Sequence, residues 1–240
     1  MTQAQLLSLA RLRIPEINST DVISDADLLI ILNLACVKFI NRTDALPTSS
    51  LFNLVLNLNE YSLASYVSTF GKIRKEGLWI YNAENSKWNP LSPTTMSVLN
   101  RDFPSWINAD SSIPRYYSLD GDTLTLYPKA SATYAGTNYL KIYHFARSTD
   151  MAGSTQYPFS GSASIRYPHL ADFEEVLIDY VRYEMKEIIG KAGDGAASQS
   201  KFYLECDEIK KKLMSRPDLI PYIQSVGAGN LQFHQGAFQR

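Results

Sequence analysis

Apolar residues follow a helical period near both ends of the chain and alternate in its middle. At the amino terminus, Thr2 and Gln5 have the spacing of a capping box, which predicts a short helix over 3–12. Ser24 is placed to cap a second helix, in which apolar residues from Leu28 to Phe39 recur at intervals of three and four. We expect this second helix to bury its apolar face against helices from the carboxy-terminal half.

Two further helices are predicted after Pro168, since two apolar stripes are separated by a Gly-containing break at 190–195. The spacing of Asp207 to Lys211 favours an ion pair along the second of these helices. The first stripe is Phe173, Val176, Leu177, Tyr180, Val181, Met185 and Ile188; the second is Phe202, Cys206, Ile209 and Leu213. The short break between them predicts an antiparallel pair.

The middle of the chain is typical of β-structure. Apolar and polar residues alternate over Phe52–Leu58, which predicts a strand with one buried face. A second strand is expected over Gly71–Ile80. Ser92-Pro93 then favours the start of a short helix that ends near Phe103.

A hairpin is the sharpest local signal in the sequence. Tyr116–Leu119 and Thr123–Tyr127 are β-prone runs that flank Asp120-Gly121-Asp122, and Asp-Gly favours a tight turn because glycine accepts a positive φ. Pro128 ends the second strand because it has no N–H for a ladder. A third strand follows at Leu140–Tyr143. One sheet or a small sandwich satisfies this pattern equally well.

The predicted fold class is therefore α+β, with a helical bundle core, an inserted antiparallel β domain and an extended C-terminal tail. The core combines the amino-terminal helices with the carboxy-terminal antiparallel helix pair. The expected divisions are the amino-terminal helices at 1–46, a β-rich insert with one short helix at 47–150, a long loop at 151–167, the helix pair at 168–216 and the tail at 217–240.

This ordered set of elements resembles the tailed-bacteriophage head-to-tail connector family, whose members are portal adaptors. The features that carry the resemblance are a strand ending in Asp-Gly, a strand of the form Leu-x-Leu-x-Pro, and a strand of the form Leu-x-Ile-x-Tyr. Its residues here are Tyr117 to Asp120, Leu124, Leu126, Pro128, Leu140, Ile142 and Tyr143. The order of elements matches over nearly the whole chain.

The resemblance implies a virion structural protein, made in the host cytoplasm, that forms a ring of twelve copies around the DNA channel. Its partners would be the portal protein, neighbouring copies of itself and a downstream tail or nozzle protein. We expect the tail to bind the portal through Leu219, Ile220, Tyr222, Ile223, Leu231, Phe233 and Phe238. The long loop is expected to contact a neighbour or the tail through Tyr157, Phe159 and Tyr167.

Charge and hydropathy narrow the classes of partner. A net charge of −1 and a pI near 6.3 provide no basic stripe for neutralising phosphates, so DNA is expected to pass through the ring without specific binding. The most apolar run, Leu28 to Ile40, is broken by Asn33 and Lys38 and is shorter than the ~20 residues that span a bilayer. No membrane association is expected, and no signal peptide is visible.

Little in the sequence indicates catalysis. Cys36 and Cys206 lie on apolar helical faces and read as reduced core thiols. His144, His169 and His234 are isolated, without the spacing of a zinc site. Because no nucleophile elbow or phosphate-binding loop is present, we expect no cofactor, no metal and no enzymatic activity.

Aromatic residues leave an alternative open. Tyr, Phe and Trp make up 12% of the chain, and such rings serve protein interfaces and sugar stacking alike. A carbohydrate-binding or other aromatic-rich binding module, with Trp79 and Trp88 as platforms, is the second interpretation. A hydrolase site assembled from distant residues is a third that the sequence neither shows nor forbids.

Overall fold

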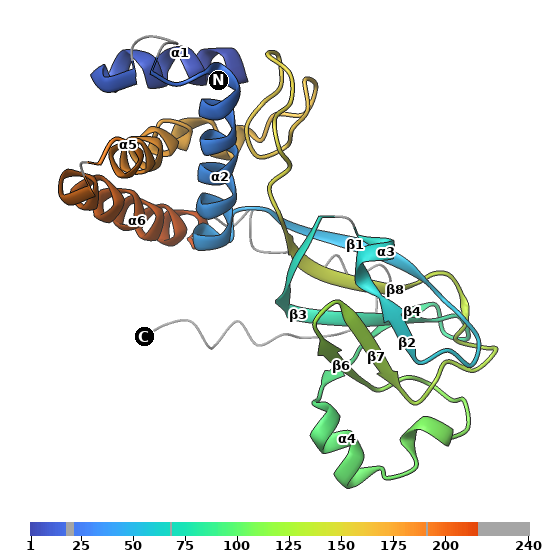
Figure 1. Cartoon of the computed structure of the whole chain (residues 1–240). Helices are drawn as coiled ribbons and strands as arrows, with labels where there is room; N and C mark the ends of the chain where they lie inside the picture. The colour runs from blue at the N-terminus through green and yellow to red at the C-terminus, as the bar shows by residue number, and fades with distance from the viewer. Residues whose placement is uncertain (18–21, 68, 191, 216–240) are drawn as a thin grey trace.

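A computed structural model describes residues 1–17, 22–67, 69–190 and 192–215 of the chain. Helices gather at one end of the molecule and strands at the other, joined by the chain leaving the second helix and by the chain returning from the last long strand (Figure 1). The helical part contains α1 (Gln3–Arg13), α2 (Asp25–Thr43), α5 (Val176–Ile188) and α6 (Ala192–Met214), with 3-10 turns at Pro15–Ile17 and Pro168–Phe173. The chain thus has the α+β class that its sequence predicts.

The predicted starts of both amino-terminal helices are confirmed. The Thr2 and Gln5 side chains each bond to the other residue's backbone N–H, which completes the capping box of α1. The Ser24 hydroxyl accepts a bond from the Asp27 N–H at the start of α2. Helix α2 ends at Asp44, whose φ of 57° places it in the left-handed region that stops a helix.

The core of the helical part lies among α1, α2, α5 and α6, and α2 contacts both carboxy-terminal helices. The second predicted stripe is confirmed, because Phe202, Cys206, Ile209 and Leu213 are all buried. One residue of the first stripe differs from the prediction: Ile188, the last residue of α5, is 63% exposed.

The β part contains two four-stranded sheets. Sheet A has the order β1-β8-β3-β4, and sheet B has the order β2-β7-β6-β5. Their strands are β1 (Pro47–Leu54), β2 (Glu60–Ser62), β3 (Phe70–Asn82), β4 (Lys87–Pro90), β5 (Ser92–Pro93), β6 (Tyr116–Asp120), β7 (Thr123–Tyr127) and β8 (Gly136–Ala146). All pairs are antiparallel except β5 with β6, which is parallel.

The two sheets share one core, so the β part is a small sandwich rather than one sheet. Leu78, Ile80 and Leu140 from sheet A belong to the same buried cluster as Leu124 and Leu126 from sheet B. The short helices α3 (Leu63–Tyr66) and α4 (Met96–Asp102) connect strands of this part. Aromatic packing of Phe103 on Tyr116 and Tyr127 places the end of α4 against sheet B.

The predicted hairpin is confirmed, whereas two neighbouring predictions are wrong. Strands β6 and β7 are joined through Gly121, whose φ is 58°. The strand expected over 52–58 ends at Leu54, because Asn57 adopts a φ of 62° and turns the chain, leaving Leu56 and Leu58 exposed. Ser92-Pro93 is a strand, and Thr95 is the residue that caps α4.

Among the described residues, no helix has the length and apolarity needed to cross a membrane. The segment 216–240, which includes the predicted portal-binding residues, lies outside the described residues. Those residues are Leu219, Ile220, Tyr222, Ile223, Leu231, Phe233 and Phe238.

Candidate interaction surfaces

Asp44 links the helical part to the β part. Its carboxylate pairs with Lys72 of β3 at 2.6 Å and with Lys210 of α6 at 2.8 Å, and its side chain is only 9% exposed. One acidic group at the end of α2 therefore contacts both parts. Beside it, the His169 ring bonds to the Ala45 carbonyl at 3.1 Å, which ties the 3-10 turn before α5 to the same connection.

A pocket of about 350 Å³ opens at this junction. Phe145 of β8 lies on one side, with the Lys72 ammonium 5.5 Å and the Arg74 guanidinium 5.7 Å from the ring centroid. Arg74 also pairs with Glu76, so part of its charge is neutralised. The pocket is lined by Thr43, Asp44, Ala45, Pro47, Lys72, Arg74, Lys75, Glu76, Phe145, Leu213 and Met214.

The outer face of sheet A carries half-buried aromatic rings. Tyr81 of β3 lies 5.4 Å from Trp88 of β4 and 5.1 Å from Tyr139 of β8, so three strands contribute to one aromatic group. Trp79 shares this face, since residues two apart on a strand point the same way. Its indole N–H donates to the Glu76 carbonyl at 2.9 Å. The sequence had singled out Trp79 and Trp88, but only the sheet register joins them to Tyr81 and Tyr139.

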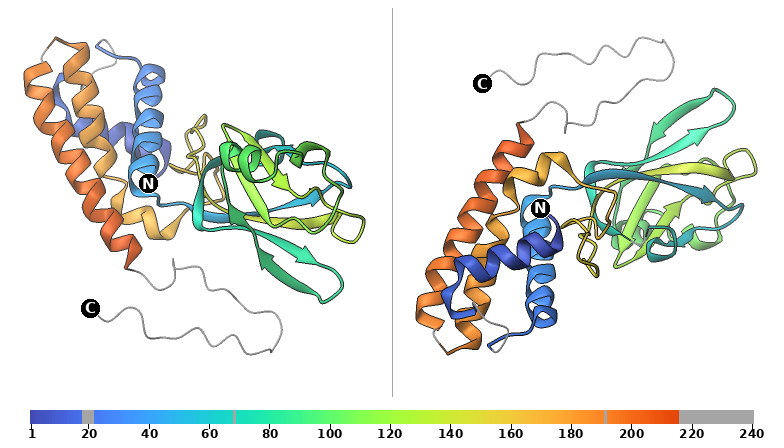
Figure 2. Two further views of the ribbon diagram at one scale, coloured as in Figure 1. Left: turned by 90° about the horizontal axis from the view of Figure 1, so that it is seen from below. Right: turned by 90° about the horizontal axis from the view of Figure 1, so that it is seen from above.

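Lys141 stands in the centre of this face. In the strand register it lies between Leu51 of β1 and Trp79 of β3, and its ammonium is 4.9 Å from the Tyr143 ring centroid. We call the set Trp79, Tyr81, Trp88, Tyr139, Lys141 and Tyr143 the aromatic face. The hairpin of β3 and β4, which carries part of it, extends away from the rest of the sandwich (Figure 2).

A second exposed apolar group lies at the end of the β part farthest from the helices. Val55, Leu56 and Leu58 are 46%, 48% and 37% exposed in the turn after β1 (Figure 1). Strand β1 starts beside the helical part at Pro47, paired with Phe145, and reaches Gly136 at its far end. The sequence prediction missed this group because it assigned Leu56 and Leu58 to a buried strand face.

A third apolar group lies on the helical part. Val22, Ile30 and Ile188 are all more than half exposed and line one shallow depression where the start of α2 meets the end of α5. Leu34 lies one turn after Ile30 on α2 and is also exposed. Helical periodicity places Leu34 and Ile30 on one face, but only packing shows that this face is uncovered.

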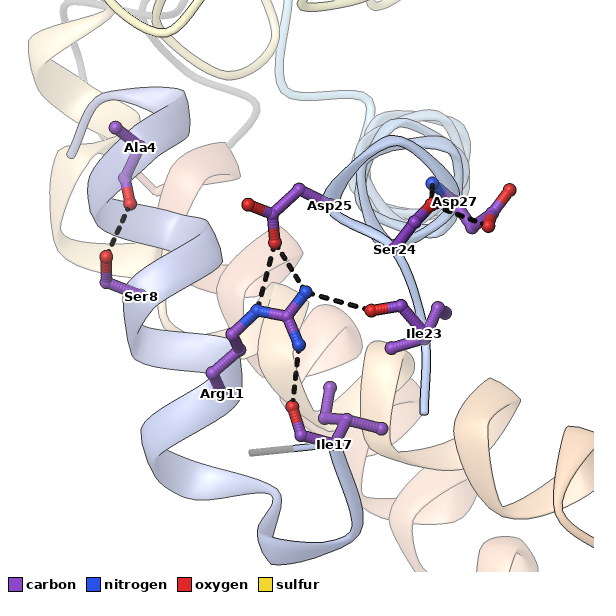
Figure 3. Close-up of polar contacts among 8 residues, drawn as sticks. All are labelled: Ala4, Ser8, Arg11, Ile17, Ile23, Ser24, Asp25 and Asp27. Atoms are coloured by element: carbon purple, nitrogen blue, oxygen red, sulfur yellow. Dashed lines mark hydrogen bonds and ion pairs between the residues drawn. The ribbon is translucent and has the colours of Figure 1, made fainter. Parts of the chain in front are cut away.

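The start of α2 is held in place by Arg11 of α1 (Figure 3). Its guanidinium bonds to the Asp25 carboxylate and donates to the carbonyls of Ile17 at 2.8 Å and Ile23 at 3.0 Å. These bonds join the two chain segments on either side of residues 18–21. Ser24 beside them bonds to the Asp27 carboxylate at 2.6 Å, which supports the cap of α2.

The long loop before α5 packs onto the helical part. The side-chain amide of Asn33 in α2 forms two hydrogen bonds with the backbone of Met151. It donates to the Met151 carbonyl and accepts from the Met151 N–H, both at 3.0 Å. The Phe159 ring is 2% exposed and lies 5.2 Å from the ring of Phe39. The expectation that Phe159 contacts a partner is therefore corrected. Its ring is buried in the core of the helical part.

Tyr157 and Tyr167, the other two expected contact residues of the loop, are half-buried. Arg166 lies over the Tyr157 ring at 5.7 Å and pairs with the buried Glu174 at 3.6 Å. Tyr167 packs against the helical core. Ile165 between them is 54% exposed, and the sequence prediction did not include it.

Burial sets the protonation of the two cysteines and of His144 in the described cores. Burial raises the pKa of the Cys36 and Cys206 thiols to about 12, so both remain protonated. Burial also lowers the pKa of His144, whose Nε2 lies 3.0 Å from the Ser50 hydroxyl. Within the described ranges, no His, Cys, Asp and Glu side chains gather in a group that could hold a metal ion.

The Asp207 carboxylate faces another helix rather than its own. The Arg42 guanidinium of α2 bonds to it at 2.6 and 2.7 Å, and this bonding lowers the pKa of Asp207. The pair predicted along α6, with Lys211, is replaced by a contact that ties α2 to α6. Only the packing of the two helices could show which cation Asp207 meets.

Comparison with protein families gives one match that covers most of the chain. Residues 1–219 match the model of a family described as SU10 adaptor protein. The match includes the helical part, the β part and the long loop, and it ends at the third residue of the predicted tail. No curated protein matches the chain.

Proposed function

The chain belongs to the SU10 adaptor protein family, a phage head-to-tail adaptor family, and on this premise we propose that it forms a ring joining the portal to the tail. Family membership makes it a structural component of the virion that interacts with other head or tail components. The ring, its twelve copies and the partners on each side are the proposed part. The helical part and the far end of the β part would meet different partners.

The separation of exposed apolar groups is the observation that supports this function best. One group, with Ile30 and Ile188, lies on the helical part, while Val55 and Leu56 lie at the opposite end of the β part (Figure 1). Where exposed apolar residues form a contiguous patch, the patch is a candidate interaction site. A protein that links two bodies needs separate surfaces, and the exposed apolar groups of this chain lie on parts with separate hydrophobic cores.

Repetition would make weak contacts durable. A ring needs a heterologous interface, in which one surface of each copy meets a different surface of the next. Once a ring is nearly closed, the remaining contacts become effectively intramolecular and their strength rises without new bonds. The formal charge of −1 also suits a channel, because strong phosphate binding would oppose the movement of DNA.

Portal binding is proposed for the tail. Among the described residues, the buried core of the helical part extends as far as Leu213 of α6, just before the predicted tail. The tail carries apolar and aromatic side chains that would act as anchors, with Phe233 and Phe238 foremost. The other proposed portal contacts are Leu219, Ile220, Tyr222, Ile223 and Leu231. Tyr157, Tyr167 and Ile165 of the long loop are proposed to meet a neighbouring copy or a tail protein.

Native mass spectrometry of the chain, alone and mixed with the portal protein of the same genome, tests this function. We expect a complex that carries twelve copies on the portal, even where the free chain is a monomer. A variant lacking Leu219–Arg240 should stay folded by circular dichroism and lose portal binding. An intact chain that ignores the portal would contradict the proposal, and undiminished binding by the shortened chain would remove the tail from it.

One observation favours a second candidate, a carbohydrate-binding module. Tyr81, Trp88 and Tyr139 gather on one exposed sheet face, and flat rings of this kind stack on sugars. A glycan array with the wild-type chain, followed by Trp88→Ala for any hit, tests it. An array without hits would leave the aromatic face to protein contacts.

A further inference from the structure

The packing of one copy leaves the aromatic face without a covering element among the described residues. The inner faces of both sheets are buried in the shared core, and Phe103 covers part of the outer face of sheet B. On sheet A, the rings of Trp79, Tyr81 and Tyr143 stay half-buried, and Leu51 beside them is 48% exposed. Aromatic rings in such positions gain most when a partner covers them.

The aromatic face and the junction pocket beside it together carry an excess of positive charge. Lys141 at the centre of the aromatic face and Lys75 near its helical end have no ion pair among the described residues. Lys72 and Arg74 add two charges, while Asp44 and Glu76 remove two. The formal balance of these six groups is therefore +2, from four cations and two carboxylates. A complementary partner would combine acidic groups with an apolar residue.

The turn between β6 and β7 has that composition. Asp120 and Asp122 are exposed and form no ion pair within the described part of the chain, and Leu119 before them is 37% exposed. The backbone carbonyl of Asp122 accepts a hydrogen bond from the Leu63 N–H at 2.8 Å, whereas a Cβ added at the tip, Gly121, would meet nothing within 4 Å. Glu60 lies two strands away on the same outward face of sheet B.

We propose that the β6–β7 turn of one copy, residues 119–122, docks on the aromatic face of a second copy. Asp120 and Asp122 would meet Lys141 and Lys75, and Leu119 would cover part of the rings. The turn belongs to sheet B and the face is the outer side of sheet A, so the two surfaces lie on different sheets of one copy. Contacts of this type are heterologous, the kind that closes rings. This inference rests on the proposed ring.

Cross-linking tests the contact directly. Asp120→Cys and Lys141→Cys variants are prepared separately, mixed at high protein concentration and oxidised with copper phenanthroline in air. The native Cys36 and Cys206 are buried, so we expect them not to form disulfides under these conditions. We expect the mixed disulfide between the two variants to exceed both symmetric dimers, and a chain carrying both changes to give a ladder of multimers. A mixed dimer no more abundant than the symmetric ones would overturn the proposal.

Charge reversal provides a second test with its own rescue. The Lys75→Glu/Lys141→Glu variant and the Asp120→Lys/Asp122→Lys variant should each self-associate at least about tenfold more weakly than wild type, because like charges then face each other. Mixed together, each variant complements the other at both surfaces, so association should return. Lys38→Glu, an exposed change on α2, is the matched control. Failure of the mixture to recover, with both variants folded, would contradict the pairing.

The two levels of the argument can fail separately. If wild-type chain does not bind the portal, the proposed function fails, while the mixed disulfide still reports the contact between copies. If both charge variants load the portal with the wild-type number of copies, the ring stands and this contact is wrong. A glycan that binds wild type and protects Trp88 from quenching would assign the face to a different occupant and overturn the inference.

Discussion

The long loop of the helical part and the outer face of sheet A both carry aromatic residues, but the two regions differ in how far these residues are buried. The loop places Met151 and Phe159 inside the helical core, where Asn33 brackets its backbone. On the outer face of sheet A, Tyr81 packs against Trp88 and Tyr139, and all three rings stay half-buried. Aromatic residues in the first place support the monomer, and those in the second remain available for a partner.

This contrast separates a stable body from a contact surface. Helices α1, α2, α5 and α6 are tied together by Arg11, Asp44 and the Arg42–Asp207 pair, which act within one copy. Sheet A has a well-buried inner side, so its outer side can vary in what it meets without loss of the fold. Substitutions in the helical core should therefore lower the free energy of unfolding, whereas substitutions on the outer face of sheet A should mainly change binding to a partner.

The largest expected difference is between Phe39→Ala and Trp88→Ala. Phe39 is fully buried against Phe159, so its truncation should lower the free energy of unfolding by about 3–5 kcal/mol. Trp88 is half-exposed and should lose only about 1 kcal/mol of ring contact. Urea unfolding of both variants measures the gap. Equal losses would mean that the aromatic face is part of the fold rather than a contact surface.

Arg11→Ala should produce the next largest effect. The substitution leaves the carbonyls of Ile17 and Ile23 without their charged donor, and we expect a loss of about 2 kcal/mol in unfolding free energy. Arg13→Ala is the matched control on the same helix, since its pair with Glu175 is exposed and should contribute less than about 0.5 kcal/mol. A comparable loss in the control would show that the Arg11 network does not hold the start of α2.

Asp44→Asn sharpens the comparison by weakening the link between the two parts. Asparagine tolerates the left-handed backbone, so the change removes the charge that Lys72 and Lys210 share without adding strain. Because Lys72 is largely exposed, we expect a loss of only about 1–2 kcal/mol.

Calorimetry then shows whether the helical and β parts still unfold together in this variant. Asp207→Asn, which breaks an exposed pair inside the helical part, should leave the two parts coupled. A single transition of unchanged midpoint in Asp44→Asn would contradict a role for Asp44 at the junction.

The smallest expected effect is a pH dependence from His144 in β8. Burial lowers its pKa in the folded chain below the ordinary 6.5, so the unfolded chain binds more protons in that range. Stability should therefore be fully present above about pH 6.5 and fall as pH decreases toward the lowered pKa. Arg74 disfavours the protonated ring in the same direction.

His144→Gln should flatten this part of the stability curve, measured by urea unfolding between neutral and mildly acidic pH. Glutamine can still bond to Ser50 and carries no titrating group. A curve that keeps its slope in the variant would assign the dependence to other groups.

Local chemistry explains why the helices and the hairpin were predictable. The capping pairs of Thr2 with Gln5 and of Ser24 with Asp27 lie within one helical turn, and the turn at Gly121 needs only its own positive φ. The strand predicted from Phe52 was too long. Nothing in the pattern of Leu56 and Leu58 shows that Asn57 turns the chain. The burial of Phe159 could not be predicted either, because the loop that contains it has no periodic pattern.

The sequence by itself determined the order and type of most elements, the starts of α1 and α2, the β6–β7 turn and the reduced state of the two cysteines. Tertiary structure decided the two sheets, the junction at Asp44 and the aromatic face, because these depend on contacts between residues far apart in the chain. Periodicity reports which side of a strand or helix is apolar. Whether that side is covered depends on what else folds against it, and for sheet A the covering surface is proposed to be another copy.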